Sequence, residues 1–495
     1  MQPLTTKDTL LPPMPVLTKD IAASLVVFLV ALPLCIGVAV ASGVPAELGL
    51  VTGIVGGLVT GLLPGSSLQV SGPAAGLTVL VFEAVQTYGL PVLGVIVLAS
   101  GLLQIIFGAL RLGRWFRAIS VAVVEGMLAG IGLIIIVGQL YTMAAAQQPG
   151  SGLAKLAGLP DLLRNAVATP DRLVPLVLGL GTILIIVAWT RVPARLRVVP
   201  GALVAVLVVS IGAKVSSAGV PAVKVEGLLS AIQPPAAGDF ARLAQSGFLA
   251  TVLAFTLIAS AESLFSAAAV DRLHDGPQTQ LDRELIAQGA GNTACGLLGA
   301  LPMTAVIVRS ATNVHAGAQT KASRVFHGLW LLLFAALLPA TLELIPIPAL
   351  AGVLVHAGLK LIPTRVLVRL WREHRGEAVV LAATAIAIVA VNMFEGVLIG
   401  LGLAIVKAAW EASHVQLHVD DDGSGTVKVT ATGTATFLRL PKILGVLEAL
   451  PAHRPIHLDL DKVRHLDHAC RISLTSWAGR RNAGSPAPVR ITPSL

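Results

Sequence analysis

The sequence has few charged residues, few aromatic residues and almost no cysteine. Of its 495 residues 12% are charged and 4% aromatic, whereas 55% are hydrophobic, and the mean hydropathy is +0.84. Such a chain cannot cover itself with a water-exposed surface, so lipid must cover much of it. Cys35, Cys295 and Cys470 are too few and too scattered for a disulfide framework. The composition therefore predicts an integral membrane protein.

Apolar runs separated by short polar or Pro/Gly-rich joints extend from Ile21 to about Ala412. A membrane-spanning helix needs about 20 apolar residues, and fourteen such spans fit this stretch. We expect them at residues 20–42, 46–63, 72–87, 90–110, 118–140, 172–190, 199–217, 247–268, 284–300, 309–320, 325–342, 347–361, 377–393 and 395–412.

The net charge of +9 reflects membrane topology. Basic residues gather in alternate short loops, whereas the joints at residues 88–91, 343–348 and 392–395 contain neither Lys nor Arg. The positive-inside rule then places both termini in the cytoplasm, with the spans in the inner (plasma) membrane. The basic loop residues include Arg111, Arg114, Arg272, Arg283, Lys321, Arg324, Lys360, Arg365, Arg369, Arg372 and Arg375. We therefore expect a lipid membrane as a partner and no nucleic acid.

Two of the spans begin with segments that a continuous helix cannot accommodate. Residues 68–76 read LQVSGPAAG and residues 299–310 read GALPMTAVIVRS, and each precedes the third span of one half of the chain. Paired breaks in corresponding halves are typical of an inverted-repeat transporter with a binding site at the membrane midplane. The sequence thus predicts an all-α polytopic membrane domain, a seven-plus-seven inverted repeat with two half-helix spans preceded by short strands.

The composition changes after Glu411 to that of a small α/β domain. Residues 415–419 and 426–432 alternate as strands do, and helix patterns at 441–450 and 469–480 are each followed by a strand, at 456–460 and 489–491. We divide the chain into an N-terminal cytoplasmic segment (1–18), a transmembrane transport domain (19–412) and a short cytoplasmic α/β domain (413–495).

Four motifs that occur in order give the chain a family resemblance. Residues 30–35 (VALPLC), 70–73 (VSGP), 286–292 (IAQGAGN) and 309–313 (RSATN) resemble the SulP family of anion transporters. Residues 458–460 and 466–470 resemble the STAS domain that follows the membrane domain in that family. Residues 125–132 are most similar to the bacterial branch that includes bicarbonate carriers.

The resemblance implies a transporter and not an enzyme. We expect secondary active transport of a small inorganic oxyanion, with bicarbonate favoured, by a homodimer whose STAS domain serves dimerisation or regulation. Sulfate or a dicarboxylate is the alternative substrate. A channel-like or voltage-responsive anion conductor and a nucleobase:cation symporter are alternative classes with the same architecture.

The N-termini of the two half-helices are the predicted anion site, because such termini carry partial positive charge and unpaired N–H groups. The alternative is that the small residues there only allow close helix packing. Arg309 would add a full charge, unless it pairs with a carboxylate or extends to the membrane surface. The predicted substrate-binding residues are Ser71, Gly72, Pro73, Ala74, Ala75, Ile307, Val308, Arg309 and Ser310.

Glu262 and Ser266 lie one helical turn apart, facing the same way, and form the predicted coupling site. Sodium-coupled bicarbonate members of the family resemble this chain in having an acid and a hydroxyl at these positions. This chain has Ile307 where those members have a further hydroxyl, and Ala305 where glycine is frequent. Na⁺ and a proton therefore both remain open as the coupling ion, and Na⁺ is the one bound ion expected. The alternative is that Glu262 only neutralises Arg309.

Overall fold

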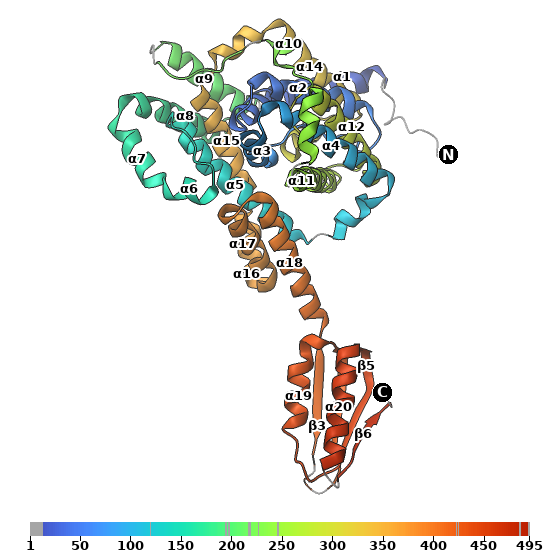
Figure 1. Ribbon diagram of the computed structural model, residues 1–495. Coiled ribbons are helices and arrows are strands. Elements are labelled where there is room, and N and C mark those ends of the chain that lie inside the picture. The colour runs from blue at the N-terminus through green and yellow to red at the C-terminus, as the bar shows by residue number, and fades with distance from the viewer. Residues whose placement is uncertain are drawn as a thin grey trace. The chain divides into compact units, whose positions relative to one another are not determined.

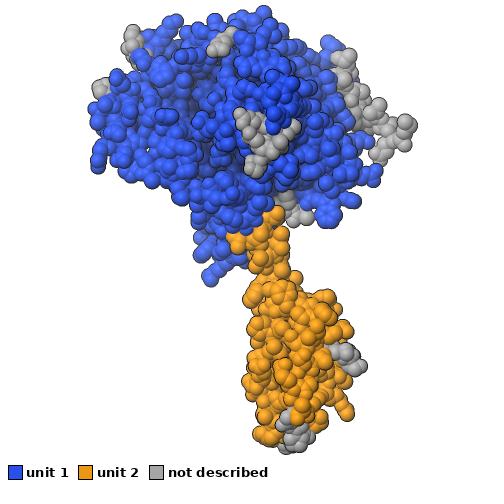
Figure 2. All heavy atoms as spheres, viewed as in Figure 1, with its two compact units in different colours: residues 1–400 blue, residues 401–495 orange. Residues whose placement is uncertain are grey.

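The computed structural model describes residues 13–118, 120–193, 196, 199–215, 219–225, 227–244, 247–421, 423, 425–484 and 487–493. The chain forms two compact units, residues 1–400 and 401–495 (Figure 2). The boundary falls inside the last apolar helix, whereas the sequence pattern suggested a division at its end, after residue 412.

Each of the fourteen predicted segments contains a helix, and seven of the described helices are long and apolar enough to cross a membrane. The helices of the first seven segments are α1 (Met14–Ala41), α2 with a π-helical turn (Ala46–Val55, Gly56–Thr60), α3 (Thr78–Tyr88), α4 (Leu90–Ala109), α5 (Val121–Met143), α8 (Pro170–Trp189) and α9 (Gly201–Val215). The second seven are α11 (Phe248–Val270), α12 (Leu281–Leu297), α13 (Ile307–His315), α14 (Ala322–Leu337), α15 (Ile347–Leu361), α17 (Arg375–Ala390) and α18 (Met393–Ala412). Short helices between them are α6 (Gly152–Ala157), α7 (Leu159–Ala168), α10 (Leu228–Ala231) and α16 (Thr364–Glu373).

The membrane helices form two bundles (Figure 1). The first, which we call the half-helix bundle, contains α1–α4 and α11–α14, and the second contains α5, α8, α9, α15 and α17. Glycines let helices of the first bundle approach closely: a methyl group on Gly57 would lie 2.4 Å from Cα of Gly328. The bundles share hydrophobic cores and meet along α1, α3, α5, α9 and α15.

Two short strands cross at the centre of the half-helix bundle, as the sequence predicted. Strand β1 (Ser71–Pro73) pairs antiparallel with β2 (Met303–Ala305), so that Gly72 lies opposite Thr304. All six residues are buried, and non-helical backbone at membrane depth is tolerated only inside protein, where its polar groups are satisfied. The Asn292 side chain satisfies the backbone of Met303: it accepts a hydrogen bond from the Met303 N–H (2.7 Å) and donates one to the Met303 carbonyl (3.0 Å).

The expectation that Arg324 lies in a loop is wrong. Arg324 is buried inside α14, and its guanidinium donates hydrogen bonds to the carbonyls of Gly61, Leu63 and Gln69. It satisfies the backbone of the loop that leads into β1, and such carbonyls need a donor when no water reaches them.

The second unit contains a four-stranded sheet with two helices, which confirms the predicted elements. The strand order is β3 (Val415–Asp420), β4 (Val427–Ala435), β5 (Ile456–Leu466) and β6 (Val489–Thr492); β3 pairs antiparallel with β4, and the other pairs are parallel. Helices α19 (Leu440–Glu448) and α20 (His468–Gly484) contribute to one core with the sheet.

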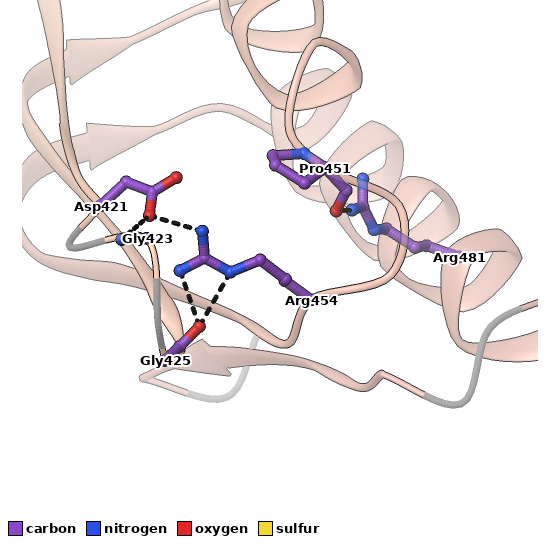
Figure 3. Close-up of polar contacts among 6 residues, drawn as sticks. All are labelled: Asp421, Gly423, Gly425, Pro451, Arg454 and Arg481. Atoms are coloured by element: carbon purple, nitrogen blue, oxygen red, sulfur yellow. Dashed lines mark hydrogen bonds and ion pairs between the residues drawn. The ribbon is translucent and has the colours of Figure 1, made fainter.

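Polar contacts tie the loops of this unit together (Figure 3). Arg454 forms an ion pair with Asp421 (2.6 Å) and donates two hydrogen bonds to the carbonyl of Gly425. Arg481 of α20 donates to the carbonyl of Pro451. Asp467 accepts hydrogen bonds from the amides of Cys470 and Phe437. Burial alone would raise the pKa of Asp467, but these hydrogen bonds hold it below its usual value.

Candidate functional site

A cavity of about 230 Å³ lies between the two bundles, where the half-helices begin. A water molecule occupies about 30 Å³ in the liquid, so the cavity has room for a small anion with several waters. The half-helix bundle lines it with Leu34, Val38, Pro73, Ala75, Gly76, Glu262, Phe265, Ser266, Val306, Ile307, Val308 and Arg309. The second bundle and the turn after α15 line it with Val124, Glu125, Met127, Leu128, Ala357, Lys360, Leu361 and Pro363.

Both half-helices present their N-termini to this cavity. The 3₁₀ turn Ala75–Leu77 leads into α3, and α13 begins at Ile307. Neither α3 nor α13 has a side-chain N-cap, so their first N–H groups are not satisfied in the usual way. Ile307 and Val308 are 40% and 43% exposed, which shows that solvent reaches the start of α13. Two helix N-termini with their partial positive charge make this cavity suited to an anion.

Arg309 supplies a buried positive charge beside these termini. The residue is 1% exposed, and its Nη2 donates a long hydrogen bond (3.4 Å) to the carbonyl of Pro73. Its Nε and Nη1 have no hydrogen-bond partner among the described residues. A methyl group on Gly72 would lie 2.2 Å from Nη1, so the absence of a side chain there leaves room for the guanidinium. A buried cation without a carboxylate partner favours a bound anion.

Glu262, on α11, lies against the 3₁₀ turn that leads into α3 and lines the same cavity. A methyl group on Gly76 would be 2.7 Å from Oε2 of Glu262, and this oxygen has no hydrogen-bond partner among the described residues. Ser266, one turn along α11, also lines the cavity and is buried.

The sequence did not identify Thr304, which faces the Glu262 carboxylate from β2. Its side chain is fully buried, and its hydroxyl has no hydrogen-bond partner among the described residues that meets the usual geometric criteria. Glu262, Ser266 and Thr304 thus place oxygen atoms from two elements near one another. The packing of β2 against α11, where the Ala305 amide donates a hydrogen bond to the Ser263 hydroxyl, brings these groups together, although a hydroxyl within the second broken segment was a visible signal.

Five of the predicted residues do not line the cavity: Ser71, Gly72, Ala74, Ala305 and Ser310. The Ser71 hydroxyl accepts a hydrogen bond from Nε2 of Gln288 (2.7 Å). The Ser310 hydroxyl accepts one from the amide of Val70 (2.9 Å) and donates one to the carbonyl of Val306. Ala74 and Ala305 are buried in the packing around the strands. These residues support the site, whereas Pro73, Ala75, Ile307, Val308 and Arg309 face the cavity.

The cavity opens at one end of the helices. Its lining includes Glu125 near the start of α5, Phe265 and Ser266 in the last turns of α11, and Lys360 in the last turn of α15. By chain direction these positions lie on the same membrane side as the end of α13. Lys360 is exposed at this mouth, where a positive charge favours the approach of an anion.

Comparison with known proteins agrees with this architecture. Residues 17–384 match the sulfate permease family. The bicarbonate transporter BicA of Picosynechococcus sp. (strain ATCC 27264 / PCC 7002 / PR-6) is 27% identical over 476 residues, which cover 87% of this chain and 79% of BicA. YvdB of Bacillus subtilis (strain 168), named as a candidate sulfate transporter, is 27% identical over 394 residues, covering 78% of this chain and 73% of YvdB.

Solved structures share the fold at low sequence identity. The transmembrane domain of a cyanobacterial BicA superposes with a TM-score of 0.64 at 23% identity, covering 79% of this chain and 98% of that domain. Murine SLC26A9, described as an anion transporter in the inward-facing state, superposes with a TM-score of 0.76 at 14% identity, covering 97% of this chain and 86% of that one.

Proposed function

Because the chain belongs to the sulfate permease family, we propose that it is a secondary active transporter of a small inorganic oxyanion, with bicarbonate as the favoured substrate. The observation that carries the proposal is the cavity where two half-helix N-termini meet a buried arginine that has no carboxylate partner among the described residues. The BicA relative supports bicarbonate, and the sulfate transporter relatives keep sulfate as the second candidate.

The charge and polarity of the cavity favour a monovalent anion over sulfate. Arg309 is the one buried arginine or lysine in its lining, and most of the other lining residues are apolar. The cost of moving an ion into a low-dielectric site rises with the square of its charge, so a dianion loses far more hydration energy than bicarbonate does. One guanidinium and two helix dipoles compensate a single negative charge more completely than a double one.

Coupling to Na⁺ or H⁺ is the second part of the proposal, with Glu262, Ser266 and Thr304 as the residues involved. An ionised Glu262 repels an anion in the same cavity, so a bound Na⁺ or proton raises anion affinity, and this difference in affinity is the coupling. Ile307 supplies no oxygen, but Thr304 offers one from β2. Three side-chain oxygen donors still leave Na⁺ and H⁺ both open.

The remaining parts of the proposal rest on the sequence pattern and the family resemblance. The spans lie in the inner membrane with both termini in the cytoplasm, since basic residues gather in alternate loops. The C-terminal unit is a STAS domain, and the transporter is a homodimer to which this domain contributes contacts.

Uptake by proteoliposomes tests the proposal. Purified protein is reconstituted, and entry of radiolabelled bicarbonate or sulfate is followed under an imposed Na⁺ gradient, an imposed H⁺ gradient, or neither. We expect accumulation of bicarbonate above its equilibrium level under one gradient and little uptake by protein-free vesicles. Accumulation of sulfate instead would replace the substrate. Large passive anion currents without accumulation would identify a channel-like conductor.

A further inference from the structure

Lys155 is a buried lysine on a short helix between two membrane spans. It belongs to α6, in the segment that joins α5 to α8, yet it is only 4% exposed. A lysine in such a segment can normally extend into water, and burying its ammonium group is unfavourable unless other groups compensate the charge. The surroundings of this side chain must therefore hold it in place.

Helix α6 is attached to the second bundle. The Tyr141 hydroxyl, on α5, donates a hydrogen bond to the carbonyl of Lys155 (2.8 Å). At the other end of α6, a methyl group on Gly152 would lie 2.3 Å from the carbonyl oxygen of Val389 on α17, so the two backbones are in direct contact. When the second bundle moves, α6 therefore moves with it.

The Lys155 side chain reaches the half-helix bundle. Its Nζ lies 5.4 Å from the ring centroid of Phe82 on α3, a distance at which a cation and an aromatic ring attract each other. Glu83, the next residue on α3, attracts the ammonium group electrostatically. A side chain anchored on one bundle is thus partly compensated by a ring and a carboxylate of the other, while burial remains the larger effect on its charge.

This contact lies farther along the half-helix than the cavity. Pro73, Ala75 and Gly76 line the cavity just before α3, whereas Phe82 and Glu83 are at the middle of α3, in the direction of Tyr88. The cavity opens at the other end of the membrane helices, near Glu125 and Lys360. For the cavity to open on the α6 side, α3 must separate from α6.

We propose that Lys155, Phe82 and Glu83 form a latch that keeps the α6 side of the transporter closed, so that the strength of this contact sets the balance between the two open conformations. Separating the bundles there breaks the cation–π contact and the attraction between Lys155 and Glu83, so the latch favours the conformation described here. The inference builds on the proposed transport function, but a distance measurement tests it without any transport assay.

The experiment places spin labels on Thr87→Cys at the end of α3 and Asn165→Cys on α7, both exposed positions, in the full-length protein in lipid nanodiscs. The three native cysteines are buried, which limits their labelling. Electron–electron double resonance then gives the distribution of distances between the bundles. We expect Lys155→Met to raise the population of longer distances by about threefold, as loss of a cation–π contact would.

Matched variants separate the latch from general destabilisation. Arg164→Gln removes an exposed positive charge from the same segment and should leave the distribution unchanged. Lys155→Arg should preserve the short distance, and the charge swap Lys155→Glu with Glu83→Lys should restore it relative to Lys155→Glu alone. An unchanged distribution in Lys155→Met, or no recovery in the swap, overturns the proposal. If the parent protein takes up no anion, the proposed transport function is rejected, but the distance measurement still tests the latch.

Discussion

Arg309 and Glu262 line the same cavity, and no ion pair joins them among the described residues. Arg309 lies beside the strand residues Gly72 and Pro73, whereas the Glu262 carboxylate lies against Gly76 at the start of α3. Each side chain has buried polar atoms without a hydrogen-bond partner among the described residues, so each is suited to an ion of its own. This arrangement argues against the alternative that Glu262 only neutralises Arg309.

Replacing Glu262 with glutamine should separate coupling from transport. The amide resembles the protonated acid in shape, but it can neither release a proton nor bind Na⁺ strongly. We expect exchange of labelled for unlabelled anion to persist while accumulation driven by an ion gradient disappears. Both rates are measured in the same proteoliposomes. Glu343→Gln, which changes an exposed carboxylate after α14, serves as the control. Accumulation by Glu262→Gln at the parental level would place the coupling site elsewhere.

Thr304→Val tests the hydroxyl that faces Glu262. Valine keeps the shape of threonine but lacks the oxygen that would contact the coupling ion. A polar contact with a charged group contributes about 1.5 kcal/mol, so we expect roughly a tenfold higher concentration of coupling ion for half-maximal uptake. The measurement is uptake against Na⁺ concentration, and against pH. Thr312→Val removes a hydroxyl that bonds only within its own helix, to Val308, and should leave both curves unchanged. Equal curves for parent and Thr304→Val would exclude this residue from coupling.

Of the residues that the sequence assigned to the site, the two charged ones line the cavity, whereas several of the small ones do not. Arg309 and Glu262 could be found because an ionisable residue in a membrane span is rare and usually functional. Ser71 and Ser310 were assigned to the anion, but their hydroxyls hold neighbouring groups of the scaffold. Which way a small side chain points depends on the strand register, and a three-residue strand has too little pattern to show it.

At the scale of elements, the close approach of β1 to α13 depends on Gly72. A methyl group there would collide with Nη1 of Arg309, the flexible end of a long side chain, so Gly72→Ala should fold but displace the guanidinium. We expect normal yield and thermal stability with weaker anion binding, seen as a raised KM for uptake. Strong loss of folded protein would show that the strand backbone cannot adjust.

The contrasting variant is Gly57→Ala, where the added methyl group meets backbone atoms of Gly328 and no flexible side chain can yield. Overpacking of this kind costs about 1–3 kcal/mol. Its expected signature is a lower melting temperature in detergent with an unchanged KM for the protein that remains folded. A parental melting temperature would mean that the helices can move apart at this crossing.

The sequence predicted the helices well and their ends less well. Long apolar runs identify spans, but α3 begins at Thr78, after a strand and a 3₁₀ turn, and α13 ends at His315, about five residues before the expected end. Composition cannot distinguish a strand, a turn and a helix inside one short apolar segment. The sequence placed Arg324 in a loop for a related reason. A pattern of charges along the chain does not show that a buried arginine will donate hydrogen bonds to loop carbonyls.

At the scale of the whole molecule, the two units have separate hydrophobic cores. All described members of the C-terminal core lie between Val415 and Ile491, and the main cores of the first unit draw on no residue beyond Val397. Independent cores are the physical mark of domains that can fold alone. The sequence pattern divides the chain after residue 412, where the long apolar runs end, whereas the compact units divide after Gly400.

Deleting residues 413–495 should therefore preserve transport. The truncated chain keeps α18 to its last residue, Ala412, and loses no described member of the membrane cores. We expect the truncated protein to insert correctly and to take up anion, per folded molecule, at the rate of the full-length protein. The fraction of dimers falls if the removed domain contributes contacts between copies. Size-exclusion chromatography with light scattering gives the oligomeric state, and proteoliposomes give the uptake. If the truncated protein inserts normally but takes up no anion, the C-terminal unit is part of the transport mechanism and not a separate regulatory domain.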